Sequence, residues 1–237
     1  MSEALDHCRH GKEVCSDCAV RMFSICSSLE TNELESLDAL STHVTFEPKD
    51  TLFTQDQDAD CVYNLTEGVV RLYKLLPDGR RQIVGFALPG DFLGLAMAQR
   101  YGFSADAVDH VKACRFVRGE FANFLDEKPH LLRRLHEVTS HELSIAQDQM
   151  MLLGRRTADE KVATFLINWR NRWARLTGRS VTIPLPMSRQ DIADYLGLTI
   201  ETVSRTFSRF GKEKTILVVP DGVRMLDLPR MERLAAA

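Results

Sequence analysis

The sequence contains no apolar run long enough to span a membrane, and residues 1–21 are polar and rich in cysteine, unlike a secretory signal peptide. Internal helical repeats and low-complexity segments are also missing. Hydrophobic residues make up 44% of the 237 positions. We therefore expect a soluble, globular, cytoplasmic protein that does not contact membranes and is long enough to hold two domains.

Catalytic motifs are equally scarce. No Ser-His-Asp set, phosphate-binding loop or pair of catalytically spaced carboxylates stands out, and the seven histidines are scattered or lie beside cysteines. An enzyme is therefore the least favoured class of function.

The whole chain has no large excess of charge of one sign, since its net charge is −3. Its two parts, however, carry net charges of opposite sign. Residues 158–237 carry 13 Lys and Arg against 9 Asp and Glu, whereas residues 1–157 carry 17 against 24. A basic C-terminal part on an acidic body favours contact with nucleic acid at that end.

Residues 187–210 predict two short helices around a tight turn. Ser188 can cap the first helix, and Asp191 three residues later completes a capping box. Gly197 supplies the turn. Apolar residues of the second helix recur at helical spacing and should face the core: Ile200, Val203, Phe207 and Phe210.

Glu201, Ser204 and Arg205 share one polar face of the second helix, because they lie at positions i, i+3 and i+4. An arginine can bind guanine through two hydrogen bonds, and a glutamate can accept one from the cytosine amine. These residues predict a helix that reads the major groove of double-stranded DNA. The alternative is an ordinary helix pair with a solvated, charged face.

The other segments predict an α+β fold in which strands precede helices. Thr31 and Asn32 should cap a helix that ends at Leu40, and residues 43–116 show short strands broken by turns, typical of a small barrel or jelly roll. A long helix, a helix opened by Thr157 and running through Trp169, and a wing-like hairpin over residues 216–226 should follow. The expected domains are a cysteine-rich arm (1–28), a β-roll sensor (29–128), a dimerisation helix (129–157) and a winged helix-turn-helix (158–237).

The long helix, residues 129–156, should be roughly 40 Å long, which exceeds what one small domain can cover. Its apolar residues follow a heptad-like stripe, which predicts a homodimer through Leu131, Leu135, Val138, Ile145 and Leu152. Glu142 and Gln149 fall on the same stripe and should weaken that seam. The alternative is a helix buried against its own β-roll.

Six cysteines in a cytoplasmic chain favour metal or redox chemistry over a disulfide framework. Four of them lie close together in the sequence: Cys8, Cys15, Cys18 and Cys26. Cys61 and Cys114 are isolated in apolar surroundings, where a cysteine is usually a small buried hydrophobe. Cys8 and His10 ahead of Cys15 and Cys18 also offer a zinc-binding set.

The order of cysteine arm, β-roll, long helix and winged helix-turn-helix resembles the cAMP receptor protein superfamily, and more closely its FNR branch. Residues 67–94 are similar to the β-roll signature of that family, and residues 198–205 are similar to the FNR reader helix. Within that branch, this sequence looks most similar to the FixK- and FnrN-like regulators of alphaproteobacteria and to a regulator of anaerobic aromatic-acid degradation.

The resemblance implies a transcription regulator of anaerobic genes that binds DNA as a homodimer. Glu201, Ser204 and Arg205 would read a TTGAT half-site, and Ser188 and Thr199 would also contact DNA. The exposed turn Asp78, Gly79 and Arg80 would lie where the family touches RNA polymerase, although a plain solvated hairpin explains this turn equally well.

The resemblance also implies that Cys15, Cys18, Cys26 and Cys114 hold an oxygen-labile [4Fe–4S] cluster. The gap between Cys18 and Cys26 is longer than in the enterobacterial protein, which leaves Cys8 as a substitute ligand. The alternative is a regulator without a cluster, whose cysteines bind zinc or sense redox state as thiols.

Cyclic nucleotides are not expected to bind. Members of the superfamily that bind them present an Arg-Ser pair to the cyclic phosphate, whereas residues 101–106 here place Phe103 before Ser104 and add Asp106. A phosphate would therefore meet a carboxylate where it needs a guanidinium group.

Overall fold

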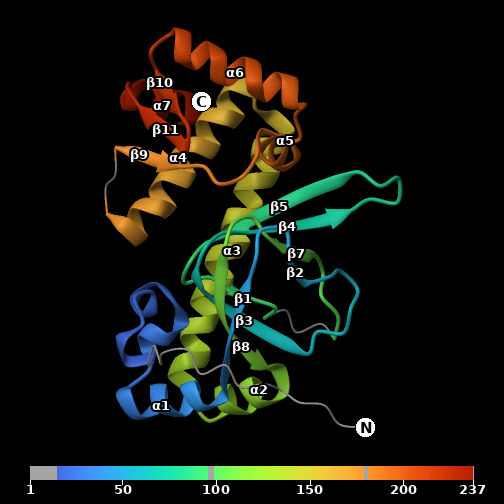
Figure 1. The fold of residues 1–237 in the computed structure, drawn as a ribbon, viewed down its shortest axis with the longest axis vertical. Coiled ribbons are helices and arrows are strands. Elements are labelled where there is room, and N and C mark those ends of the chain that lie inside the picture. The colour runs from blue at the N-terminus through green and yellow to red at the C-terminus, as the bar shows by residue number, and fades with distance from the viewer. Residues whose placement is uncertain (1–14, 96–98, 179–180, 237) are drawn as a thin grey trace.

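The computed structural model describes residues 15–95, 99–178 and 181–236 of the 237-residue chain. An N-terminal β-roll and a C-terminal helical domain lie one above the other, and the long helix α3 (Pro129–Arg155) runs beside both (Figure 1). Among the described helices, none is both long enough and apolar enough to cross a membrane.

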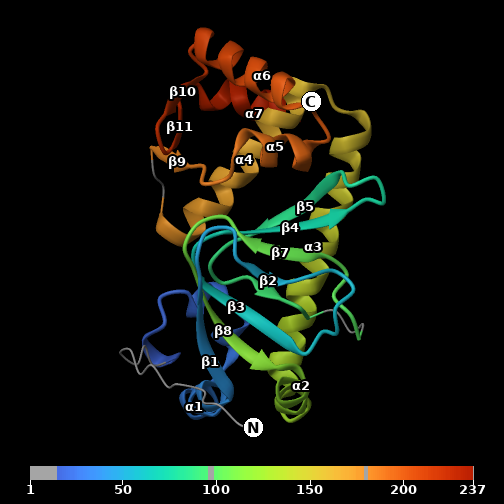
Figure 2. The same cartoon turned by 45° about the vertical axis from the view of Figure 1, so that its right-hand side comes forward.

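The β-roll consists of two antiparallel four-stranded sheets, which confirms the expected jelly roll. One sheet has the order β1-β8-β3-β6 and the other the order β2-β7-β4-β5. The strands are β1 (Ser41–Phe46), β2 (Thr51–Phe53), β3 (Cys61–Glu67), β4 (Val70–Leu75), β5 (Arg81–Ala87), β6 (Phe92–Leu93), β7 (Ser104–Ala107) and β8 (Val111–Val117). Figure 2 shows the two sheets facing each other beside α3.

Side chains of β3 alternate between two cores, because successive residues of a strand point to opposite faces of the sheet. Tyr63 and Leu65 enter the core between the sheets. Val62 enters a second core on the outer face of the β1-β8-β3-β6 sheet, where Cys114 and Phe116 of β8 join it. This outer core is where the cysteine arm docks.

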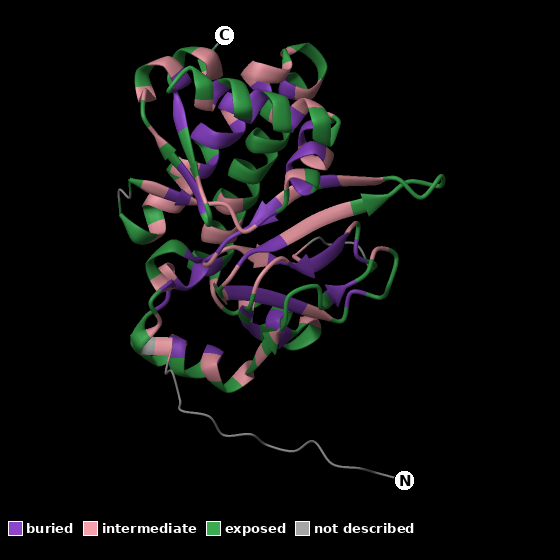
Figure 3. Cartoon of the chain, turned by 45° about the horizontal axis from the view of Figure 1, so that its top comes forward, coloured by how far each residue is buried: buried purple, intermediate pink, exposed green. Residues whose placement is uncertain are grey.

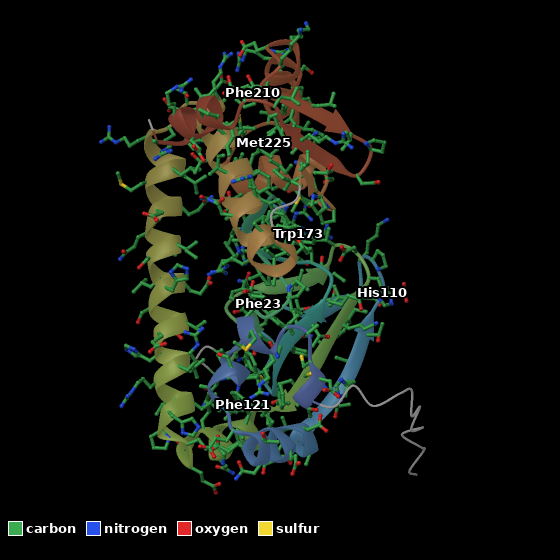
Figure 4. The ribbon with its side chains drawn as sticks, turned by 90° about the vertical axis from the view of Figure 1, so that its left-hand side faces the viewer. Phe23, His110, Phe121, Trp173, Phe210 and Met225 are labelled. Carbon is green, nitrogen blue, oxygen red and sulfur yellow. The ribbon has the colours of Figure 1, made fainter. Side chains whose placement is uncertain are left out.

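The described part of the cysteine arm, residues 15–28, folds as three short 3-10 helices: η1 (Cys15–Asp17), η2 (Arg21–Phe23) and η3 (Ile25–Ser28). With α1 (Thr31–Leu40) and α2 (Arg118–Asp126), they cover the outer face of the sheet and contact the start of α3. Figure 4 shows Phe23 and Phe121 in this region, beside α3. The arm is therefore packed against the β-roll and the long helix.

The expected cap of α1 was wrong. The N-cap is Glu30, and the backbone N–H of Glu30 donates to the Glu33 carboxylate at 2.9 Å. Thr31 is already helical, because a glutamate pair closes the capping box one residue earlier than a Thr-Asn cap would.

The C-terminal domain contains α4 (Ala158–Thr177), β9 (Thr182–Pro184), α5 (Arg189–Leu196), α6 (Ile200–Lys212), β10 (Ile216–Val219), β11 (Gly222–Met225) and α7 (Leu228–Ala236). The hairpin β10–β11 pairs with β9 in the expected place of a wing. Helix α4 continues eight residues beyond the expected end at Trp169, because Trp173 and Leu176 still pack against the domain core.

The helix-turn-helix forms as expected in all but one residue. Ser188 and Asp191 form the capping box of α5, and Gly197 ends that helix in the left-handed region, with φ of 60°. Val203, Phe207 and Phe210 are buried, but Ile200 is 37% exposed, so its expected place in the core was wrong. Ile200 is the first residue of α6, at the end of the helix that the domain core does not cover.

The dimer stripe expected on α3 was wrong for four of its five apolar residues, whereas the fifth, Ile145, is 37% exposed. Leu131 and Leu152 are buried within the single chain, and Leu135 and Val138 pack against the outer core of the β-roll. The side-chain amide of Gln149 donates to the backbone oxygen of Tyr195 at 3.0 Å. Most of this stripe therefore faces the chain's own domains, which is the alternative that the sequence left open.

A second heptad stripe lies one residue further along α3 and is exposed throughout. Its members are Leu132, His136, Thr139, Leu143, Ala146 and Met150. They alternate at spacings of four and three residues, the periodicity of a helix that packs against a partner helix. Among the elements that the structure describes, Figure 4 shows none along the outer side of α3.

Candidate nucleic-acid interface and candidate metal centre

Helix α6 begins with a side-chain cap. Thr199 has extended backbone angles, and its hydroxyl accepts from the backbone N–H of Thr202 at 3.2 Å. A capped N-terminus fixes the first turn, where Glu201 lies. The pKa of Glu201 is lowered because its carboxylate accepts from its own backbone N–H and from the Thr199 hydroxyl. Glu201 is thus held as a carboxylate at the exposed end of the helix.

The buried side of α6 fixes the direction of its exposed side. Val203, Thr206, Phe207 and Phe210 are buried, so Glu201, Ser204 and Arg205 lie together on the opposite face and are exposed. Figure 3 shows this helix at the surface of the C-terminal domain with an exposed outer face. The three residues expected to read DNA are therefore on one accessible surface, and Ser188 at the start of α5 is exposed as well.

The exposed face of α6 continues beyond the residues that the sequence singled out. A shallow concave surface is lined by Ser204, Arg205, Ser208, Arg209 and Lys212. Arg209 also pairs with Asp159 of α4, so its charge is partly neutralised within the domain. Extending the i, i+4 spacing by two helical turns would have found Ser208, Arg209 and Lys212.

Arg189 supports α6 from the first helix of the pair. Its guanidinium carbon lies 3.3 Å from the centre of the Phe207 ring, a cation–π contact. Burial lowers the pKa of Arg189 to about 10, which leaves the side chain charged at neutral pH. Sequence reasoning missed this residue, because its partner lies eighteen positions away on another helix.

The helix-turn-helix is tied to the β-roll through α5. Arg81 of β5 donates to Asp191 at 2.7 Å and to Asp194 at 2.8 Å. Arg71 of β4 lies 3.4 Å from Asp191 and 3.1 Å from Asp106 of β7. Two arginines of the β-roll thus bind two aspartates that precede α6.

Asp106 is buried in the β-roll, and its charge is satisfied internally. It accepts from Arg71, from the Thr51 hydroxyl at 3.0 Å and from the Tyr73 hydroxyl at 3.3 Å. Arg71 therefore offsets the repulsion that we expected Asp106 to exert on a phosphate. Arg71 itself is already paired with two carboxylates, those of Asp106 and Asp191.

The structure brings the four cysteines expected to bind a cluster into one neighbourhood. Cys114 of β8 and Cys26 of η3 are buried in the outer core of the β-roll, and Cys15 of η1 packs against the same core. Cys114 and Cys26 both act electrostatically on Cys15, and Cys18 acts on Cys26. Cys8 lies outside the described residues.

Polar side chains lie beside two of these thiols. The Cys15 thiol donates to the Asp38 carboxylate at 3.3 Å, and the Cys114 sulfur lies 4.0 Å from Nδ1 of His43. Burial and then the Asp38 hydrogen bond raise the pKa of Cys15, and burial raises the pKa of Cys26. The thiols of Cys15 and Cys26 are therefore protonated at neutral pH unless a metal takes the place of the proton.

The residues fit an iron–sulfur cluster in donor chemistry, and they lie in one region of the fold. Four cysteine thiolates are the usual ligands of a [4Fe–4S] cluster. Within the described part of the chain, no group of three His, Cys, Asp or Glu is close enough to hold a single metal ion. Ligands of a four-iron cluster stand around a cube of iron and sulfide, so they lie further apart than the ligands of one ion.

Cys61 lies in a different environment from these four cysteines. It packs against the core between the two sheets, and its backbone N–H donates to the Tyr101 hydroxyl at 3.2 Å. Burial raises the pKa of its thiol. Cys61 thus packs against an apolar core as its sequence context suggested, but it is only partly buried.

The turn between β4 and β5 projects from the molecule (Figure 3). Gly79 has a φ of 82° and closes the turn by donating from its backbone to Leu76 at 2.9 Å. Asp78 and Arg80 pair with each other at 2.7 Å, and their side chains are 51% and 77% exposed. All three residues expected to touch RNA polymerase are accessible.

The sequence matches two known protein families in the same order as the two structural parts. Residues 185–216 match the family described as "Bacterial regulatory proteins, crp family". Residues 43–128 match the family described as "Cyclic nucleotide-binding domain".

Characterised relatives resemble the chain over nearly its full length. The "Transcriptional activatory protein AadR" of Rhodopseudomonas palustris is 58% identical, and the match covers 93% of this chain and 92% of that protein. The "Nitrogen fixation regulation protein FixK" of Bradyrhizobium diazoefficiens is 56% identical, with 94% of each chain covered. Among solved structures, FixK2 from Bradyrhizobium japonicum has a TM-score of 0.78 and 37% identity, covering 83% of this chain and 98% of that one.

Proposed function

Because the chain belongs to the Crp/FNR family of bacterial DNA-binding regulators, we propose that it is an oxygen-responsive activator of anaerobic and microaerobic genes. In the proposed active state it binds a [4Fe–4S] cluster, is a homodimer, and recognises a TTGAT-type palindrome. The observation that carries the proposal is the gathering of four cysteines against the start of α3. Binding chromosomal DNA would place this activity in the cytoplasm.

The exposed face of α6 supports the proposed reading of DNA. Arg205 can donate two hydrogen bonds to the O6 and N7 atoms of guanine, and Glu201 can accept one from a cytosine amine. Ser188 and Thr199, at the starts of the two helices, lie where side chains and helix N-termini commonly contact phosphates. Lys212 adds positive charge at the other end of the same face.

The exposed heptad stripe of α3 supports a homodimer. A second copy of the same helix would cover Leu132, Leu143 and Met150, which are 46%, 60% and 64% exposed in the single chain. Two copies related by a twofold axis would present two reading helices to a palindrome, because each half-site needs one helix.

Cys15, Cys18, Cys26 and Cys114 would hold the cluster, whose sensitivity to oxygen supplies the signal. The chain's own contribution is mechanical. The cysteine arm contacts α3 through η3, and Leu135 and Val138 of α3 pack against the same core as Cys26 and Cys114. Fixing the arm would therefore brace the first half of the dimerisation helix.

Glu142 should weaken the dimer seam less than the sequence suggested. It lies one residue off the exposed stripe, and Asp91 and Arg172 of the same chain act on it electrostatically. No carboxylate occupies the exposed stripe itself, so repulsion between carboxylates does not act at its core positions. Release of the arm would then alter the position of α3 more than it separates the subunits.

The proposal is tested on protein purified without air, by absorption spectroscopy, by iron and sulfide analysis and by DNA-binding assays. The wild type should be brown, contain iron and acid-labile sulfide, and bind the palindrome, and air should remove both the colour and the binding. Cys114→Ser should abolish the colour, whereas Cys61→Ser should keep it, because Cys61 belongs to the other core. A colourless wild type, or a brown Cys114→Ser protein, would overturn the ligand assignment.

The alternative function is a regulator of the same family whose cysteines bind zinc or act as thiol sensors. The contact between Cys15 and Asp38 favours it, because a thiol donating to a carboxylate needs no metal. Metal analysis separates the alternatives: zinc without sulfide indicates a zinc protein, and no metal indicates a thiol sensor.

We also propose that the β-roll binds no cyclic nucleotide. Arg71 is engaged by Asp106 and Asp191, and Phe103 precedes Ser104 where the nucleotide-binding members carry arginine. Calorimetric titration with cAMP should give no binding heat, and saturable binding would contradict this part of the proposal.

A further inference from the structure

Asn64 is a buried polar residue in an otherwise apolar environment beside the cysteines. It is 3% exposed and lies on β3 between Val62, which belongs to the outer core, and the turn to β4. Its cross-strand partner on β8 is Cys114, and on β6 it is Phe92. Directly paired residues of neighbouring antiparallel strands project to the same face of a sheet. Asn64 therefore shares the face on which the cysteine arm docks.

The amide of Asn64 is only partly satisfied by the protein. Its Nδ2 atom donates to the sulfur of Cys26 at 3.9 Å, and its Oδ1 atom is buried without a hydrogen-bond partner. A buried polar atom without a partner destabilises the fold, whereas an apolar side chain of the same shape would carry no such cost. The outer core, made of Ile25, Val62, Phe116 and similar residues, would accept a leucine at this position.

We propose that Asn64 is a positioning residue of the metal centre and donates N–H hydrogen bonds to its cysteine sulfurs. This inference rests on the proposed function, because it requires that Cys26 and Cys114 hold a cluster. One N–H group already points to Cys26, and the second is available to a sulfur on the side of Cys114, the cross-strand neighbour.

The role of the Asn64 amide is to stabilise the negative charge of the cysteine thiolates. Four thiolates bring negative charge into a buried site, and a bond from a neutral N–H to an anionic sulfur is stronger than the same bond to a thiol. Asp38, beside Cys15, contributes charge of the same sign as the thiolates. Hydrogen bonds to the sulfurs help to set the stability and potential of an iron–sulfur cluster. Asn64 supplies such bonds from the rigid sheet, opposite the arm.

The test compares Asn64→Leu with wild type and with Tyr63→Phe. Leucine keeps the approximate shape of asparagine and removes both N–H donors and the unpartnered oxygen. Tyr63→Phe is the matched control, because it removes a polar group from the neighbouring residue of β3 whose side chain enters the other core, where its hydroxyl donates to Leu52. Each protein is loaded anaerobically with iron and sulfide, and iron release to a ferrous chelator is followed.

We expect iron release from Asn64→Leu to be about tenfold faster than from wild type, the usual size of an effect from a group that supports a metal ligand. The metal-free Asn64→Leu protein should melt at the wild-type temperature or above it. Tyr63→Phe should release iron at the wild-type rate.

Four outcomes would overturn the inference in distinguishable ways. Equal rates for wild type and Asn64→Leu would show that the amide does not support the cluster. A lower melting temperature of the metal-free variant would show a structural role. Faster release from Tyr63→Phe as well would show general loosening of the sheet. A wild type that takes up no cluster would refute the proposed function and this inference with it.

Discussion

Arg205 and Glu201 lie one helical turn apart on the exposed face of α6, so each can reach a different base of a half-site. Replacing Arg205 by alanine removes a guanidinium group that can bind guanine through two hydrogen bonds. We expect the variant to lose about 1–3 kcal/mol of binding free energy on a TTGAT-type palindrome and to discriminate less at the G·C pair. Fluorescence anisotropy on the palindrome and on single-base variants measures both effects.

Lys212 provides the matched control for Arg205, since it lies further along the same face. Lys212→Ala should weaken binding to all sequences alike and reduce the dependence of affinity on salt by about one unit of slope, as expected for a phosphate contact. If Arg205→Ala gave this uniform loss, Arg205 would contact a phosphate and not a base.

Single residues also show which parts of the two sites could be predicted from the sequence. Glu201, Ser204 and Arg205 follow from helical spacing alone, because their neighbours in space are neighbours in sequence. His43 and Asn64 do not, because they meet the cysteines only after β1, β3 and β8 pair. Asp38 does not either, because it meets Cys15 only when α1 packs against η1. Cysteine spacing could suggest a metal centre but could not identify the polar groups around it.

At the scale of elements, the hairpin β4–β5 combines anchored strands with a free tip. Its strands bind α5 through Arg71 and Arg81, and its tip carries the exposed pair Asp78 and Arg80. We expect the double substitution Asp78→Ala and Arg80→Ala to lower transcription several-fold in vitro with unchanged DNA affinity, if the tip contacts RNA polymerase. Transcription at the wild-type level would leave the tip as a plain solvated turn.

The contact between β5 and α5 should couple the two domains energetically. Arg81 and Asp194 are 24% and 15% exposed, and their two hydrogen bonds measure 2.8 and 3.0 Å. A double-mutant cycle of Arg81→Ala and Asp194→Ala should give a coupling of about 1–3 kcal/mol in urea unfolding. The exposed pair Lys112 and Glu67, in the same β-roll, should give less than about 1 kcal/mol. A coupling no larger than in that pair would show that the pair Arg81–Asp194 does not couple the two domains.

Helix α3 shows why the sequence could predict an element but not its partner. Its bounds follow from Pro129 and from the absence of any further proline in the helix, and they were expected to within one residue. Its two heptad stripes, one beginning at Leu131 and the other at Leu132, have the same periodicity. Periodicity cannot say which stripe the chain's own β-roll will cover, because that depends on strands and arm residues far away in the sequence.

At the scale of the whole molecule, the exposed stripe predicts where two subunits meet. Leu143 is 60% exposed near the middle of α3, so Leu143→Glu would place two carboxylates in the centre of a seam formed by two copies. Losing both buried leucines and adding this repulsion should cost about 3 kcal/mol or more, a dissociation constant at least about 100-fold higher. Sedimentation equilibrium without air measures the change.

Met151 supplies the control for this last prediction. It is 66% exposed and lies next to the stripe but not on it, so Met151→Glu should remain dimeric. Two reading helices held by the seam would stand one DNA turn, roughly 34 Å, apart. Leu143→Glu should therefore lose affinity for the palindrome while keeping the wild-type affinity for an isolated half-site. A Leu143→Glu protein as dimeric as Met151→Glu would place the seam elsewhere, and the buried stripe that begins at Leu131 would then have to separate from its own β-roll before two subunits could meet.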